Sequence, residues 1–175
     1  MNLKKKLLLL LTIIGLQCYV NAQENKELFT IYLVRHSEKG VSTTNPKNPP
    51  LTTCGEQRAE SLSKFLKKVD LDVIYSTNYI RTKSTAKPTA KSKNKTIKIY
   101  NPRKLNQFAK TLIEKKEDAL VVGHSNTTGV LAGLLVGKKI EPFDESIYNR
   151  IYQVVIHKKT GRLHVLNTSF SCDKF

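Results

Sequence analysis

The chain has 175 residues, a length that suits one domain with one sizeable hydrophobic core once an amino-terminal targeting segment is set aside. Its formal net charge of +16, which falls to +13 without the three lysines of the first 22 residues, favours anionic partners. The lysines are scattered and are not interleaved with aromatic residues, which argues against nucleic acid as the partner. Charge therefore indicates an anionic ligand without identifying it.

Residues 1–22 are typical of a secretory signal peptide. Three lysines precede an apolar run at residues 7–16, and small residues stand at the expected cleavage site. The run is too short for a permanent membrane helix, since a spanning helix needs about 20 apolar residues. Cleavage would leave a single domain, residues 23–175, in the periplasm or outside the cell. Lipidation of Cys18 is the alternative to cleavage.

The first predicted elements are a strand, a loop and a helix. An apolar, β-branched run predicts a buried strand at residues 28–34, which stops abruptly at the charged stretch 35–39. A loop rich in Ser, Thr, Asn and Pro follows at residues 40–50. Thr53 and Glu56 then resemble a capping box at the start of an amphipathic helix. Its apolar positions at helical spacing are Ala59, Leu62, Phe65, Leu66 and Val69.

Strands continue to alternate with helices further along the chain. Residues 71–75 predict a second buried strand, and cap candidates at 76–78 begin a helix that carries Arg81 in its first turn and is kinked or ended by Pro88. The remaining predicted elements are a strand at 97–100, a helix at 105–114, a strand at 119–122, a helix at 127–136, and strands at 151–157 and 162–168 joined by a hairpin turn at 159–161. This order predicts an α/β fold, a three-layer sandwich in which helices flank a mostly parallel, mixed central sheet.

Three of the predicted strands end in polar clusters. Ligands of α/β sheets bind at the carboxyl ends of the strands, so neighbouring parallel strands would bring these clusters to one edge. Two arginines there suit a phosphoryl group, because each guanidinium grips two oxygens and keeps its charge near neutral pH. A neutral histidine can attack phosphorus, and a protonated second histidine can stabilise the charge of the transition state. The side chains concerned are Arg35, His36, Arg81 and His124.

These residues also resemble the motifs of the histidine phosphatase superfamily, the phosphoglycerate mutase-like enzymes, in its small single-domain phosphatase branch. The resemblance runs in order through most of the domain. Its motifs are Leu33-Val34-Arg35-His36-Ser37-Glu38-Lys39, Pro50-Leu51-Thr52 with Gly55 and Ala59, Tyr75-Ser76-Thr77 with Arg81-Thr82 and Thr85-Ala86, and Val122-Gly123-His124-Ser125-Asn126. The resemblance implies His36 as the phosphorylated nucleophile, Arg35 and Arg81 as phosphate ligands, and His124 as the second histidine of the pocket. It implies no metal ion and no organic cofactor.

The proton donor to the leaving group does not follow from the resemblance. Family members take it from a carboxylate soon after the helix of the second arginine, or from one beside the second histidine. Here Ser125 follows His124, and the lysine-rich stretch 91–98 contains no acidic residue. Glu38, two residues past His36, is the candidate acid, with a structural or solvated carboxylate as the equal alternative.

The predicted function is hydrolysis of small phosphorylated substrates, esters or anhydrides including phosphohistidine, through a phosphohistidine intermediate on His36. One alternative is a noncatalytic protein that binds phosphate or other anions in the same pocket. A second is a phosphosugar or phosphoglycerate mutase, which export and the short segment between Arg81 and His124 both disfavour.

Two further expectations concern residues outside this constellation. Cys54 and Cys172 would remain after signal cleavage and could pair in an oxidising compartment if the fold brings them together. Arg58 and Arg103 are expected on solvated faces, the usual environment of arginine.

Overall fold

The computed structural model describes residues 26–172, so the predicted signal peptide and Cys18 lie outside the described part of the chain. One six-stranded sheet forms the middle layer, in the order β3-β2-β4-β1-β5-β6. Four neighbouring strands run parallel, and an antiparallel hairpin extends the sheet beyond them. The parallel strands are β1 (Leu28–Arg35), β2 (Val73–Ser76), β3 (Ile97–Ile99) and β4 (Ala119–Gly123), and the hairpin is β5 (Arg150–His157) with β6 (Thr160–Asn167).

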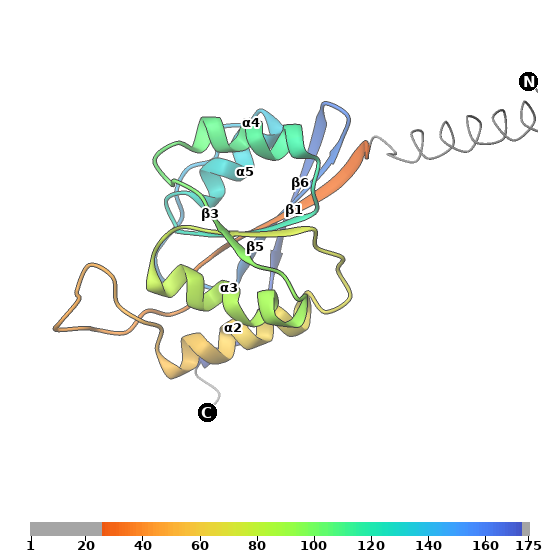
Figure 1. The fold of residues 1–175 in the computed structure, drawn as a ribbon. Helices are drawn as coiled ribbons and strands as arrows, with labels where there is room; N and C mark the ends of the chain where they lie inside the picture. Colours follow the sequence, from red (N-terminus) through yellow and green to blue (C-terminus); the bar gives the residue numbers. More distant parts are fainter. Residues whose placement is uncertain (1–25, 173–175) are drawn as a thin grey trace, which may run out of the picture.

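Two helices cover each face of this sheet (Figure 1). The helices α2 (Thr53–Phe65) and α3 (Ile80–Ser92) lie on one face, and α4 (Leu105–Lys115) and α5 (Thr128–Val136) lie on the other. The predicted three-layer α/β sandwich with a mostly parallel mixed sheet is therefore confirmed. No helix within residues 26–172 is both long and apolar enough to cross a membrane.

Successive residues of the central strands point to opposite faces, so the same strands fill two hydrophobic cores. Leu33 and Val121 face the core beneath α4 and α5, whereas Val34 and Val122 face the core beneath α2 and α3. Burial on both sides explains why these strands are continuous apolar runs and do not alternate with polar residues.

Helix α2 differs from its prediction at both ends. Its N-cap is Thr52 and not Thr53, because Thr52 Oγ1 accepts a hydrogen bond from Gly55 N at 3.0 Å. The residue at the reciprocal capping-box position is then Gly55, which has no side chain to return the bond. The helix ends at Phe65, whose side chain is 49 % exposed, and Val69 belongs to the turn that follows.

Two other predicted boundaries are also corrected. Pro88 does not end α3, which continues to Ser92 because buried residues on both sides of the proline hold it against the sheet. The last hairpin turns at residues 158–159, where Lys158 adopts a φ of 56°, and Gly161 belongs to β6. A Cβ at Gly161 would lie 2.9 Å from Val136 Cγ1, so this glycine allows the strand to pass close to α5.

Candidate functional site

The carboxyl ends of β1, β2 and β4 meet at one edge of the sheet. β1 ends at Arg35, and the next backbone amide, that of His36, still donates to the Gly123 carbonyl of β4 at 3.0 Å. A cavity of about 370 Å³ opens at this edge. Its lining includes His36, Arg81, His124, Lys39, Arg103 and Glu145, and the buried Arg35 lies in ionic contact with Glu145.

His36 is buried with only one ring nitrogen engaged by the protein backbone. Its Nδ1 lies 2.8 Å from the Ser37 carbonyl oxygen, and because a carbonyl can only accept, Nδ1 carries the hydrogen. The lone pair is therefore on Nε2. Burial, together with the positive charges of Arg35 and Arg81, lowers the pKa of His36 to about 3. The imidazole is neutral near pH 7 in this structure.

His124 lies beside His36, with ring centroids 5.5 Å apart and ring planes at 70°. Its Nε2 is 3.0 Å from Thr77 Oγ1, whose own hydrogen is donated to Thr82 Oγ1 at 3.0 Å. Thr82 in turn donates to the Thr77 carbonyl at 2.9 Å, so Thr77 must accept from His124 Nε2–H. This chain of hydroxyl groups sets the tautomer of His124 and places its lone pair on Nδ1.

The environment of His124 also favours the neutral ring in the absence of an anion. Burial lowers its pKa to about 4, and the charges of Arg81, Arg35 and Lys39 act in the same direction. A bound anion would oppose this effect, because negative charge close to an imidazole raises its pKa.

Arg35 and Arg81 are each supported by an aromatic ring. The Cζ atom of Arg35 lies 4.1 Å from the centroid of the Tyr148 ring, and that of Arg81 lies 4.5 Å from the centroid of Tyr79. Arg35 also donates through Nη1 to the Glu145 carbonyl. Both guanidinium groups keep a buried Nε that has no hydrogen-bond partner within residues 26–172. An anion between them would supply acceptors.

The spacing of four residues between Arg81 and Thr85 in α3 has a direct structural reason. Thr85 Oγ1 accepts from the Ser37 amide at 2.9 Å and donates to the Arg81 carbonyl at 2.8 Å. One fully buried side chain thus connects the residue after His36 to the turn that carries Arg81. The positions of His36 and Arg81 are therefore coupled through Thr85.

Glu38 is not on the lining of the cavity, unlike His36, Arg81 and His124. Both of its carboxylate oxygens accept from Arg58 Nε at 2.9 Å, and Arg58 Nη2 lies 2.7 Å from Oε1. The side chain of Arg58 is only 11 % exposed, so its expected place on a solvated face is wrong: it is enclosed because it neutralises Glu38. The structure brings Arg35, His36, Arg81 and His124 together and directs Glu38 elsewhere.

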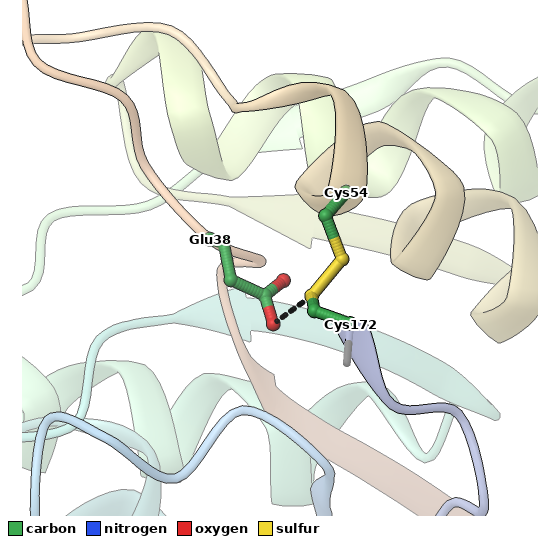
Figure 2. A group of neighbouring side chains, drawn as sticks. All are labelled: Glu38, Cys54 and Cys172. Carbon is green, nitrogen blue, oxygen red and sulfur yellow. Dashed lines mark hydrogen bonds between the residues drawn. A yellow bond between two sulfur atoms is a disulfide. The ribbon is translucent and has the colours of Figure 1, made fainter. Parts of the chain in front are cut away.

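A disulfide between Cys54 and Cys172 lies beside the Glu38 carboxylate and joins the first turn of α2 to the carboxyl-terminal segment (Figure 2). Cys172 Sγ lies 3.1 Å from Glu38 Oε1, and Arg58 Nη1 donates to the Phe170 carbonyl at 2.9 Å. Although Glu38 and the two sulfurs are close enough to share a metal ion, sulfurs bonded to each other are not thiolate ligands.

Several residues of the site carried no sequence signal. Tyr148 and Glu145 come from the loop between α5 and β5, and Tyr79 precedes α3. Within the described residues, Glu145 is the one carboxylate on the cavity lining, with Oε2 3.9 Å from both Arg35 Nη2 and Lys39 Nζ. These three side chains are recognised only by their closeness to the predicted site, and that closeness is known only from the fold.

Comparison with known proteins finds one matching family model. The model of the histidine phosphatase superfamily (branch 1) matches residues 31–102. The comparison with curated proteins finds no match to this chain.

Solved structures similar to this chain share its fold at low identity. The protein histidine phosphatase SixA complexed with tungstate is 17 % identical with a TM-score of 0.69, covering 79 % of this chain and 97 % of that one. The alpha-ribazole phosphatase from Shigella flexneri is 18 % identical with a TM-score of 0.63, covering 80 % and 96 %. The mycobacterial glucosyl-3-phosphoglycerate phosphatase is 11 % identical with a TM-score of 0.63, covering 81 % and 100 %.

Proposed function

We propose that the chain is a member of the histidine phosphatase superfamily, whose branch 1 model matches residues 31–102, and that it hydrolyses phosphate esters or anhydrides through a phosphohistidine formed on His36. The observation that carries this proposal is the state of His36: a neutral imidazole, with Nδ1–H bound to Ser37 and its Nε2 lone pair unused, on the lining of a cationic cavity. A neutral imidazole in that state is a competent nucleophile.

In the first step, His36 Nε2 attacks phosphorus and the bond from phosphorus to the leaving group breaks. Arg35 and Arg81 bind the nonbridging oxygens, and their unpartnered Nε–H groups support this role. The negative charge of the phosphoryl group raises the pKa of His124, so that its Nδ1 gains a proton and donates to the developing charge. In the second step, water attacks phosphorus, the bond from phosphorus to His36 Nε2 breaks, and inorganic phosphate leaves. The proton lost by water passes to the group that protonated the leaving group, so both that group and His36 are regenerated.

The leaving group needs a proton unless it is already a stable anion. Glu145 supports that role better than Glu38, since Glu145 lines the cavity while the carboxylate of Glu38 is held by Arg58. Glu38 then acts as a positioning residue: its carbonyl accepts from the Thr52 amide at 2.9 Å and fixes the loop after the nucleophile. Arginine and histidine supply the positive charge, so the proposed reaction requires no metal ion.

We further propose that the signal peptide, residues 1–22, is removed and that the mature domain works in the periplasm or outside the cell. The disulfide between Cys54 and Cys172 supports this proposal, because disulfides persist in oxidising compartments and are rare in the cytosol.

The test is release of inorganic phosphate from an aryl phosphate by residues 23–175, with a metal chelator present. The proposal predicts that His36→Ala lowers kcat at least about a thousandfold, as expected for loss of a nucleophile. His164→Ala is the matched control, because His164 is an exposed residue of β6. Equal activity of the parent and His36→Ala would refute the nucleophile. Phosphate binding without turnover by the parent would favour the noncatalytic binding protein instead.

A further inference from the structure

The cavity extends beyond the side chains that a phosphoryl group requires. Lys39 and Glu145 line it with the residues that follow β1, Tyr79 lines it from the start of α3, and Pro102 and Arg103 line it from the loop after β3. A substrate that carried only one phosphoryl group on a neutral remainder would leave these charged residues without a role.

The charges of the site exceed those of one phosphoryl dianion. Arg35, Arg81, Lys39 and Arg103 are cationic, and Glu145 is the carboxylate that opposes them. A phosphoryl dianion offsets two of the four positive charges, and Glu145 offsets a third whenever it is ionised. At least one positive charge therefore remains for a further anion, and a second remains while Glu145 carries the proton for the leaving group. Because Glu145 contacts Arg35 and Lys39 at 3.9 Å, the unmatched cation is Arg103.

Arg103 is a free cation on a fixed backbone. Its amide donates to Asn101 Oδ1 at 2.9 Å, and Tyr100, three residues earlier, is buried with its ring stacked on Phe108 at 4.3 Å. The guanidinium, in contrast, has no hydrogen bond or ion pair with any side chain among residues 26–172. A charged group that is presented by an ordered loop and lacks a protein partner is suited to bind a ligand.

We propose that the substrate carries a second anionic group, a carboxylate or a phosphate, on the part that is released with the leaving group, and that Arg103 binds this group. The inference rests on the proposed phosphatase function and refines its substrate class. Binding of the second anion would orient the substrate so that the phosphoryl group faces His36.

Two matched substrates test this proposal: 4-carboxyphenyl phosphate and its neutral isostere, 4-carbamoylphenyl phosphate. The amide withdraws more electron density, so leaving-group ability alone favours the neutral ester. We expect the parent chain to prefer the carboxylate in kcat/KM by about threefold to fivefold, the effect of an exposed ion pair. Arg103→Gln should abolish this preference.

The control for overall charge is Arg162→Gln. Arg162 is exposed in β6 and pairs with Val155, toward the hairpin turn, whereas the site lies at the carboxyl end of β1. The substitution removes the same unit of charge far from the cavity, so the preference should persist. Equal rates for the two esters in the parent, or equal loss in both variants, would overturn the role of Arg103.

Calorimetric binding of the two corresponding phosphonates, which cannot be hydrolysed, separates this inference from the proposed function. If Arg103 binds the second anion, 4-carboxyphenylphosphonate binds more tightly than its amide in the parent and not in Arg103→Gln. If this difference in affinity is found but neither ester is hydrolysed, the role of Arg103 in anion binding stands and the proposed phosphatase function is refuted. Turnover of both esters with equal affinity for both phosphonates would refute the anion site and retain the phosphatase.

Discussion

The disulfide allows a quantitative prediction about stability. Cys54 and Cys172 are separated by 118 residues, so the bond restricts nearly the whole domain when the chain unfolds. Loop-closure entropy for a cross-link of this span amounts to about 5 kcal/mol at 25 °C, and measured effects are often smaller. We therefore expect the double variant Cys54→Ser with Cys172→Ser to lose about 3–5 kcal/mol of unfolding free energy.

Urea denaturation of residues 23–175, followed by circular dichroism, measures this loss. With a slope of about 2 kcal/mol per molar urea, the midpoint should fall by roughly 2 M. A dithiol reductant should lower the urea midpoint of the parent toward that of the double variant and leave the midpoint of the double variant unchanged. An unchanged midpoint in the double variant, or a parent insensitive to reductant under denaturing conditions, would refute the entropic argument for this cross-link.

Three further outcomes are expected. Gly55→Ala should destabilise the domain by about 1–3 kcal/mol, because the added Cβ meets the backbone of Glu38. The free energy of unfolding should be full above pH 6.5 and decrease as the pH falls toward 4. The pKa values of His36 and His124 are about 3 and about 4 in the folded protein, so the unfolded chain binds more protons than the folded one in this range. The loss of unfolding free energy between pH 7 and 5 is up to about 2 kcal/mol for each histidine. Thr77→Val should lower kcat about tenfold and stability by about 1–3 kcal/mol, since the Nε2–H of His124 loses its acceptor.

Each of these outcomes has its own check by urea denaturation or kinetics. Gly40→Ala should be tolerated, because the nearest atoms to its added Cβ are 3.8 Å away, and equal costs at both glycines would contradict the steric reason. A flat stability profile from pH 7 to 5 would contradict the shifted histidines. Thr77→Ser, which keeps the hydroxyl, should restore kcat. If it does not, the threonine serves packing rather than the tautomer.

The fold was largely predictable because its central strands are buried on both faces. Leu33, Val121 and their neighbours form uninterrupted apolar runs, and each run ends where polar residues begin. Local patterns predicted the ends of elements less well. Thr52 and Thr53 are both good caps, and a contact distant in sequence favours Thr52, because its amide donates to the Glu38 carbonyl at 2.9 Å.

The candidate site was predictable where a residue follows a strand directly or lies in the first turn of a helix. Arg35, His36, Arg81 and His124 meet because parallel strands share one carboxyl edge. Residues that reach the cavity from long loops, such as Glu145, carry no comparable local signal. The partnership of Glu38 with Arg58 was equally hidden, because it depends on a helix packing beside the loop after β1.

The stereochemical course at phosphorus tests the central claim most directly. The substrate is an aryl phosphorothioate, in which one nonbridging oxygen is replaced by sulfur and another is an oxygen isotope, so that phosphorus is chiral. Residues 23–175 hydrolyse it in water that carries a third oxygen isotope. Transfer to His36 and then to water comprises two displacements, each of which inverts the phosphorus centre, so the account predicts net retention. Net inversion would show that water attacks the substrate directly, and would contradict a phosphohistidine intermediate on His36.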